Sequence, residues 1–369
     1  MKIVFISFFK RKDRQSLQDE VAYVKPYYII LEKLAESHAV TSIANNTIAA
    51  TYLHNKVAHE RIVDRVPNLL PLFKTYRYIC AQQPDALIIH SLHFPLQVLY
   101  ARLLLGKKVK LIIQHHAELP FVGMKRRLMR LADRFTDAYF FVSKQMAEAW
   151  VTQKNIASTK KVVEVMEVSS VFDCMLPKTA LEFTKASGTH IFLWVGRLNA
   201  NKDPLTVVKA FIQFLKEAAD ARLYMIYQKA DLLPEINLLL EANGHAREKI
   251  ILVGKKDHTE MLYWYNSAHF MVAASHYEGS GTAVCEAMSC GCIPILSNIA
   301  SFNKMTLNGS CGLLFEQANA QALAASFKKA IAMDKALARQ QTLDVYTQQL
   351  SPHAISQNIY RTIQQLKDA

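Results

Sequence analysis

The sequence predicts an α/β protein made of two Rossmann-like domains, each built on a doubly wound parallel sheet. The chain has 369 residues, which is enough for two domains of ordinary size that each bury a core. Short apolar runs alternate with amphipathic stretches, as expected for βα units in a parallel sheet. This alternation stops in an irregular stretch at about 164–187 and then begins again. We therefore expect an N-terminal domain at 1–175, a second domain at 188–350 and a C-terminal helix at 351–369.

In the first half, apolar runs rich in β-formers predict strands and longer amphipathic stretches predict helices. Residues 44–70 show neither pattern clearly. The strands are expected at 1–7, 38–43, 85–90, 109–114 and 137–143, and the helices at 20–37 (interrupted near Pro26), 70–80, 95–105, 124–134 and 143–154.

In the second half, the same patterns recur, and glycine and proline mark the ends of elements. Pro204 suits the first position of a helix, and Gly291 suits the C-cap of another. The expected strands are 190–196, 222–227, 249–254, 269–275 and 292–296, and the expected helices are one that begins at Pro204 and those at 261–268, 282–289 and 352–366.

Two carboxylates stand in one strand–loop–helix unit, Glu278 in a Gly-flanked loop and Glu286 on the helix that follows. In open α/β sheets, ligands bind outside the carboxyl ends of the strands. A helix N-terminus there favours phosphate, and carboxylates beside it can accept hydrogen bonds from sugar hydroxyls. The alternative is a solvated loop residue and an exposed helix residue.

Composition sets limits on the class of protein. The residues are 51% apolar and 20% charged, which indicates a globular chain, and no apolar run reaches the length of a membrane span. We interpret the N-terminus as a strand and not as a signal peptide. The six cysteines are scattered, which fits a reducing compartment, so we expect a cytoplasmic protein.

The net charge of +13 belongs mainly to the first half, where 27 Lys and Arg stand against 16 Asp and Glu in residues 1–186. The stretch 124–134 carries Arg126, Arg127 and Arg130, while Leu128 and Leu131 share one helical face with the neighbouring Phe135. That pattern suits a helix on an anionic membrane surface, on the inner face of the plasma membrane. A solvated basic helix packed on the domain core is the alternative. No nucleic-acid-binding module is present, so we expect no nucleic acid partner.

Two histidine pairs follow predicted strands, His90 with His93 and His115 with His116. They fit either a ligand site at the sheet edge or histidines satisfied at strand ends. A metal site is a weaker interpretation, because the pairs lie on separate loops with no further ligand pattern.

Three separated blocks carry a resemblance to a known family. The block EGSGTAVCEAMSCGCIPILS (278–297) resembles the signature of the retaining glycosyltransferases of family 4, which have the GT-B fold. The family's E-x7-E motif corresponds to Glu278 and Glu286. The resemblance extends to WVGRLNANKDPLTVVKAF (194–211) and NGSCGLLFEQANAQALAASFKKAI (308–331), covering 188–335 closely and the first half loosely.

The resemblance implies two facing domains with an active cleft between them and a C-terminal helix that crosses back to the first domain. It implies transfer of a hexose from a UDP-, GDP- or other nucleotide-sugar to a hydroxyl of a glycan or lipid-linked acceptor, with retention of configuration. The product would serve cell-surface polysaccharide, lipopolysaccharide or glycolipid synthesis. The alternatives are a catalytically silent nucleotide-sugar-binding protein and a GT-B epimerase or phosphorylase.

The resemblance also implies a role for each site residue. Glu278 would hold the donor sugar and Glu286 the ribose, and His116 would lie near the donor sugar and acceptor. The implied catalytic residues are His116, Glu278, Arg197 and Lys202, and the implied donor-binding residues are Arg197, Lys202, Glu278, Gly279, Gly281, Thr282 and Glu286. No Asp-x-Asp motif occurs, so we expect no metal and no cofactor, with Arg197 and Lys202 neutralising the diphosphate.

The chain departs from the family pattern in two loops. Phe8-Phe9-Lys10 stands where the family usually has a Gly-Gly pair, and Gln228-Lys229-Ala230 replaces a Gly-rich turn that touches the nucleoside. The resemblance therefore leaves the acceptor and the donor base open.

Overall fold

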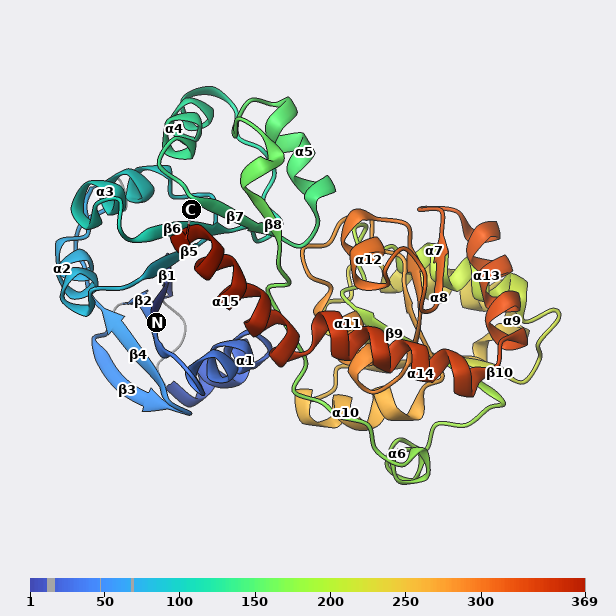
Figure 1. Ribbon diagram of the computed structural model, residues 1–369. Helices are drawn as coiled ribbons and strands as arrows, with labels where there is room; N and C mark the ends of the chain where they lie inside the picture. Colours follow the sequence, from blue (N-terminus) through green and yellow to red (C-terminus); the bar gives the residue numbers. More distant parts are fainter. Residues whose placement is uncertain (12–16, 47, 68–69, 369) are drawn as a thin grey trace. The chain divides into compact units, whose positions relative to one another are not determined.

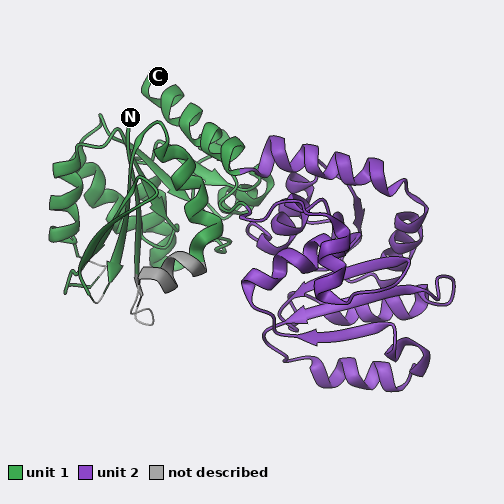
Figure 2. Ribbon diagram, turned by 90° about the horizontal axis from the view of Figure 1, so that it is seen from below, with its two compact units in different colours: residues 1–169, 352–369 green, residues 170–351 purple. Residues whose placement is uncertain are grey.

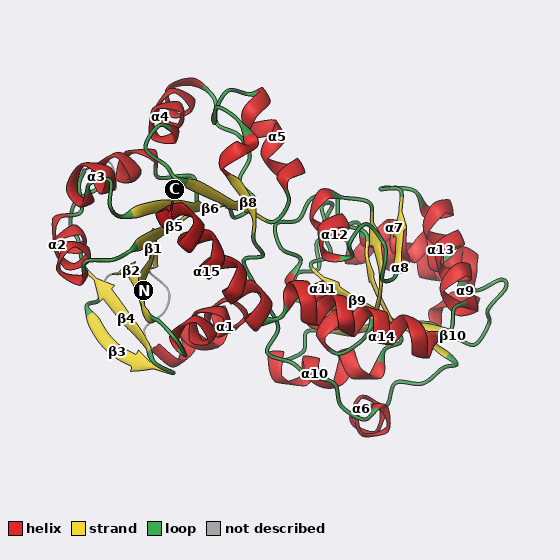
Figure 3. Cartoon of the chain, viewed as in Figure 1, coloured by secondary structure: helices red, strands yellow, loops and turns green. Residues whose placement is uncertain are grey.

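The computed structural model describes residues 1–11, 17–46, 48–67 and 70–368 (Figure 1). The chain forms two compact units, one of residues 1–169 and 352–369 and the other of residues 170–351 (Figure 2). Each unit has its own sheet with helices packed against it and its own hydrophobic core (Figure 3). The predicted α/β class with two doubly wound sheets is confirmed.

The first unit contains an eight-stranded sheet in the order β3-β4-β2-β1-β5-β6-β7-β8. All its neighbouring strands are parallel except the β3/β4 hairpin. Its elements are β1 (Lys2–Arg11), α1 (Leu17–Ala35), β2 (Ala39–Asn46), β3 (Ala50–His54), β4 (Val57–Ile62), α2 (Phe73–Gln82), β5 (Ala86–His90), α3 (Pro95–Leu105), β6 (Lys110–Gln114), α4 (Gly123–Asp133), β7 (Ala138–Phe141), α5 (Lys144–Thr152), β8 (Val162–Glu164) and α15 (Pro352–Asp368).

The second unit contains a six-stranded parallel sheet in the order β11-β10-β9-β12-β13-β14. Its elements are α6 (Pro177–Thr184), β9 (His190–Gly196), α7 (Pro204–Phe214), β10 (Ala221–Tyr227), α8 (Leu233–Glu241), α9 (Gly244–Arg247), β11 (Ile250–Gly254), α10 (His258–Ser267), β12 (Phe270–Ala273), α11 (Thr282–Ser289), β13 (Ile293–Ser297), α12 (Ala300–Met305), β14 (Leu313–Phe315), α13 (Ala320–Ala332) and α14 (Lys335–Val345).

Each sheet has one point where the chain reverses its direction of travel across the strands. In the second unit, β9 is followed outward by β10 and β11, and the chain then returns to place β12 on the other side of β9. In the first unit, β1 and β5 flank the corresponding point. The loops that leave adjacent strands at such a point diverge, so the carboxyl ends of these strands form the natural ligand crevice.

The C-terminal helix α15 belongs to the first unit, where it packs on α1. The helix predicted at 352–366 is confirmed, and its apolar side chains Ile355, Ile359 and Ile363 are all buried. Within the described ranges, no helix has the combination of length and apolar character that a membrane span requires.

Several elements differ from the sequence prediction, among them β3, β4, α6 and α10. Strands β3 and β4 were not predicted. Two of the buried positions of β4 are occupied by the polar residues His59 and Arg61, so the sequence of β4 does not alternate between apolar and polar residues. Helix α6 lies in the stretch expected to be irregular. Helix α10 begins at His258 and not at 261, because Asp257 and Glu260 form a capping box that starts the helix earlier.

Candidate functional site

In the second unit, the loops that follow β9 and β12 are bonded to each other at the reversal point of the sheet. The backbone N–H of His276 donates to the carbonyl of Asn201 at 2.8 Å, and the Asn201 amide donates to the carbonyl of Tyr277 at 3.0 Å. The imidazole of His276 lies 3.3 Å from the carboxylate of Asp203. The two loops therefore form one structured platform at the carboxyl ends of the strands.

Lys202 and Glu278 form an ion pair across this platform. Both side chains are largely covered, with 27% of Lys202 and 13% of Glu278 exposed. They line a small cavity of about 20 Å³ whose wall also includes Trp194 and Phe302. Two of the predicted catalytic residues are thus brought together, although they lie 76 residues apart in the chain.

Helix α11 points its N-terminus at the same place. Gly281, its N-cap, has φ +56°, and a Cβ there would approach the Phe302 ring to 2.9 Å. Glycine is therefore required both by the backbone conformation and by the close packing. Gly279 lies in the loop before it, and Thr282 is the first helical residue. Free N–H groups at a helix start favour an anionic group such as phosphate.

Glu286 also lies on α11, beyond its first residue Thr282, and is only 4% exposed. Its Oε2 accepts a hydrogen bond from the Tyr265 hydroxyl at 2.9 Å, and its Oε1 lies 2.8 Å from Nε2 of His258. The alternative of an exposed helix residue is therefore wrong. Burial and the neighbouring carboxylate raise the pKa of Tyr265 well above its ordinary value, so Tyr265 stays a hydrogen-bond donor.

Arg197 is exposed on the loop after β9, and its guanidinium has no hydrogen-bond or ion-pair partner among the residues that the structure describes. The backbone next to Arg197 is held in place, because the N–H of Leu198 donates to the carbonyl of Lys229 at 2.8 Å. Lys229 belongs to the loop that replaces the family's Gly-rich turn. Arg197 is therefore available to an anionic ligand.

His116 lies in the first unit, at the end of a hydrogen-bonded row of side chains. Nε2 of His116 lies 2.8 Å from Nδ1 of His90, and Nε2 of His90 lies 2.7 Å from the Tyr27 hydroxyl. On its other side, Nδ1 of His116 forms an ion pair with Glu167. The predicted histidine thus stands in a network that joins α1, the ends of β5 and β6, and the segment after β8.

The charges around these histidines set their protonation. Burial lowers the pKa of His116, but the carboxylates of Glu167 and Glu118 outweigh this effect and raise it above its ordinary value. Burial lowers the pKa of His115, which stacks on Phe141 and stays neutral. His93 lies 2.6 Å from the ammonium of Lys125. The pKa of His93 is lowered by burial and by the nearby Lys125 ammonium, so of His93, His115 and His116 it is His116 whose pKa is raised toward the charged form.

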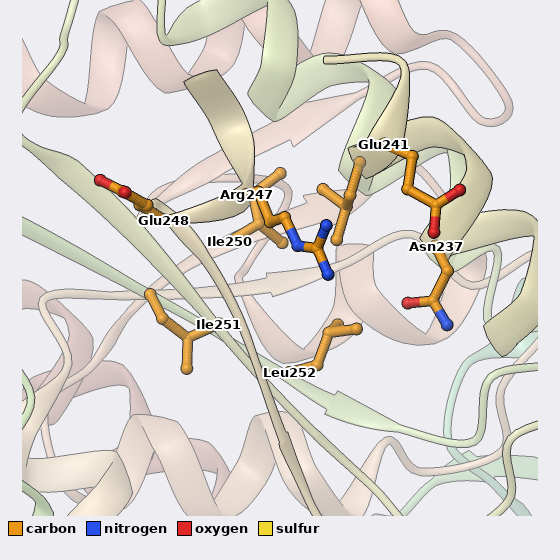
Figure 4. Close-up of a pocket in the computed structure, with 8 residues that line it drawn as sticks. Asn237, Glu241, Arg247, Glu248, Ile250, Ile251 and Leu252 are labelled. Atoms are coloured by element: carbon orange, nitrogen blue, oxygen red, sulfur yellow. The ribbon is translucent and has the colours of Figure 1, made fainter. Parts of the chain in front are cut away.

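The described residues contain no group of three or more His, Cys, Asp and Glu side chains arranged to hold a metal ion. A further pocket, of about 430 Å³, lies along the edge strand β11 (Figure 4). Arg247 reaches into it from α9, with Asn237 and Glu241 of α8 on one side and Ile250 to Leu252 of β11 beneath. The pocket borders the first residues of β11, away from the platform at the carboxyl ends of the strands.

Comparison with known proteins bears on the second unit most directly. Residues 180–342 match the family model described as Glycosyl transferases group 1. The match spans most of the second unit and falls short of half of the chain. The platform, the helix α11 and both carboxylates all lie within the matched residues.

Two curated relatives match part of the chain at 28% identity, and both are named GDP-mannose:cellobiosyl-diphosphopolyprenol alpha-mannosyltransferase. The protein from Xanthomonas campestris aligns over 149 residues, which is 40% of this chain and 39% of the relative. The protein from Xanthomonas oryzae pv. oryzae aligns over 132 residues, 36% of this chain and 35% of the relative. The chain therefore covers well under half the length of these relatives.

Solved structures resemble the whole chain. HepE from Anabaena in complex with UDP is 14% identical and matches with a TM-score of 0.76 over 99% of this chain and 100% of its own. A glycosyltransferase from Rickettsia africae matches at 16% identity with a TM-score of 0.73 over 99% and 98%, and sucrose-phosphate synthase from Thermosynechococcus elongatus at 16% identity with 0.71 over 99% of both chains. These likenesses confirm the GT-B architecture of two α/β units. The cleft implied by the resemblance stays a prediction.

Among the side chains that the prediction from sequence missed, four contact the predicted histidines and carboxylates through their own side chains. They are His258, Tyr265, Tyr27 and Glu167. The Asp-x-x-Glu spacing of Asp257 and Glu260 was a signal for the true start of α10, and it would have placed His258 at the helix N-terminus. No local signal in the sequence marks the other three.

Proposed function

We propose that the chain is a retaining, metal-independent glycosyltransferase of family 4, which moves a sugar from a nucleotide-diphosphate sugar to an acceptor hydroxyl. The observation that carries the proposal is the platform of the second unit. Lys202 and Glu278 meet there in front of the α11 N-terminus, and Glu286 lies buried on the same helix. Cation, helix end and two carboxylates are the groups that a sugar diphosphate needs.

The charge balance of this platform favours an anionic donor. Two carboxylates alone would repel a diphosphate, but Glu278 is paired with the Lys202 ammonium, and the oxygens of Glu286 face the Tyr265 hydroxyl and the His258 ring. Arg197 adds an exposed positive charge, and no carboxylate of the described ranges forms an ion pair with it. As the bond between sugar and phosphate breaks, negative charge grows on the leaving diphosphate. Arg197, Lys202 and the α11 N–H groups would stabilise it without reorganising.

In this mechanism Glu286 holds the ribose hydroxyls and Glu278 holds the donor sugar. No side chain is assigned as a covalent nucleophile. The acceptor hydroxyl attacks the anomeric carbon on the face from which the diphosphate leaves, and the leaving phosphate oxygen takes the hydroxyl proton. His116, kept toward its charged form by Glu167, would bind near the reacting groups as a hydrogen-bond donor.

The relatives suggest classes of donor and acceptor. Those from Xanthomonas are named for GDP-mannose and a diphosphopolyprenol-linked acceptor, and HepE has been solved with UDP and with UDP-glucose. We therefore propose a UDP- or GDP-sugar as donor and a lipid-linked glycan as acceptor, in the synthesis of cell-surface polysaccharide, lipopolysaccharide or glycolipid.

A lipid-linked acceptor fits the surface of helix α4. The helix packs on the core through Met129 and Ala132, while Leu131 is 40% exposed and the neighbouring Phe135 is 41% exposed. The first unit exposes further apolar side chains on α3, on α4 and in the loop before α4, namely Leu103, Leu119, Val122 and Met124, and it exposes arginines on and directly after α4, namely Arg126, Arg127, Arg130 and Arg134. We propose that this mixed surface docks on anionic lipid at the inner face of the plasma membrane.

Turnover of a donor panel tests the proposed activity. The purified protein is incubated with UDP- and GDP-sugars, with and without a polyprenyl-diphosphate glycan, in buffer containing EDTA. We expect slow donor hydrolysis without acceptor and faster, anomer-retaining transfer with it, because the protein supplies its own cations. Both activities should fall in the Glu278→Ala variant, since Glu278 contacts the sugar whose charge develops in the transition state.

Other outcomes would replace the proposal with a specific alternative. Binding of nucleotide-sugars with no turnover of any donor would indicate a silent binding protein. Formation of the epimeric nucleotide-sugar would indicate an epimerase. Loss of turnover in EDTA with recovery in magnesium would contradict the metal-independent mechanism.

A further inference from the structure

The two oxygens of the Glu286 carboxylate are held by donors of very different accessibility. Tyr265, which donates to Oε2 at 2.9 Å, is 1% exposed and belongs to the interior of the unit. His258, whose Nε2 lies 2.8 Å from Oε1, keeps 46% of its side chain exposed. The carboxylate itself is 6% exposed. His258 is thus the solvent-side neighbour of a nearly buried charge.

We expect the hydrogen bond from Tyr265 to Glu286 to persist when a ligand binds, whereas a ligand can take the place of His258. Removing Tyr265 from Oε2 would open the core, and its raised pKa keeps its proton in place. The ring of His258 could turn into water without disturbing α10, because the helix start is held by the capping box of Asp257 and Glu260. Phe172, whose ring centroid lies 4.8 Å from that of His258, supports the ring in its present position.

We propose that His258 is an internal occupant of the ribose site, whose ring holds Oε1 of Glu286 until a ribose hydroxyl of a nucleoside diphosphate displaces it. This inference rests on the proposed function, which assigns the ribose to Glu286. It adds a residue that competes with the donor. The ring keeps the buried carboxylate paired when the site is free, which avoids the cost of an unsatisfied buried charge.

Such competition lowers the apparent affinity for nucleotide, because only the fraction of protein with the ring displaced can bind it. Removing the ring should therefore tighten binding. The strength of a contact between a partly exposed imidazole and a buried carboxylate should lie between that of a surface ion pair and that of a hydrogen bond to a buried charge. We expect a gain of roughly three- to tenfold in affinity.

Calorimetric titration with UDP and with GDP tests the proposal. The His258→Ala variant should bind whichever nucleotide the wild type binds roughly three- to tenfold more tightly. The His258→Gln variant keeps an N–H donor for Oε1 and should stay within about twofold of wild type. His245→Ala, an exposed histidine of α9 in the same unit, is the matched control and should change nothing. Melting temperatures of all variants verify that they are folded.

Unchanged or weaker binding in His258→Ala would overturn the proposal, since a competitor cannot be removed without effect and weaker binding would make His258 a direct nucleotide contact. The gain must also vanish when Glu286 is changed to Ala, because no carboxylate oxygen is then contested. If the wild type and every variant bind neither nucleotide, the proposed function fails and this inference with it. If nucleotide binds through Glu286 but His258→Ala gives no gain, only this inference fails.

Discussion

Each carboxylate of the platform in the second unit is paired with a basic side chain from a distant part of that unit. Glu278 pairs with Lys202 and Glu286 with His258. The E-x7-E spacing places both acids on one loop–helix unit, so the sequence alone could predict their positions. It could not predict the partners, which lie 76 and 28 residues away along the chain and meet the acids only after the sheet has formed.

The same holds for His116. The sequence predicted this histidine as a site residue but not its ion-pair partner Glu167. Glu167 should set the charge of His116, because its carboxylate stabilises the imidazolium. In the Glu167→Gln variant, we expect the pKa of His116 to fall, as followed by NMR of the histidine rings across a pH titration. Glu148→Gln, an exposed acid on α5, should leave that pKa unchanged.

The sign of the linked stability follows from the direction of the shift. A raised pKa means that the folded state binds the proton more tightly than the unfolded state does. The stabilisation by the His116–Glu167 pair is therefore complete below the ordinary pKa of 6.5 and is lost as the pH rises through the raised value. An equal titration of His116 in wild type and Glu167→Gln would show that the ion pair does not control this histidine.

At the scale of whole elements, local sequence signals predicted the bounds of helices and strands best where the buried residues of an element are apolar. The bounds of α3 and β9 were predicted as 95–105 and 190–196, and the structure has Pro95–Leu105 and His190–Gly196. These elements are bounded by proline or glycine and carry apolar residues at regular spacing. The hairpin β3/β4 carries buried polar residues and could not be read this way.

Helix α4 was predicted as a basic amphipathic helix, and its exposed apolar face leads to a test. Changing Arg126, Arg127 and Arg130 together to Glu should abolish sedimentation with phosphatidylserine liposomes, since each cation near an anionic surface contributes about 1 kcal/mol. Wild-type binding should weaken steeply as salt is raised.

A matched triple variant controls for net charge. Lys178, Lys209 and Lys329 are exposed residues of the second unit, and their change to Glu alters the charge equally. This control should still sediment with the liposomes. If wild type does not bind the liposomes, or if both triple variants lose binding equally, α4 is a solvated helix and not a docking surface.

At the scale of the molecule, the sequence could predict two α/β domains because the βα alternation restarts after an irregular stretch. It could not predict the strand orders, since these depend on which strands pair and not on any one segment. The orders decide where the sheets reverse, and the reversal between β9 and β12 is what places Lys202 beside Glu278. Long-range pairing thus turns separate motifs into one site.

The affinity of the protein for nucleoside diphosphate tests the central claim, which is that the donor binds at this platform. Calorimetric titration with UDP and GDP should show that Glu286→Ala weakens binding by about 1.5–3 kcal/mol, roughly ten- to a hundredfold, as expected for lost hydrogen bonds to a charged group. Glu241→Ala, in the pocket along β11, should bind as wild type does. Normal binding in Glu286→Ala together with weakened binding in Glu241→Ala would contradict the account and move the nucleotide to the other pocket.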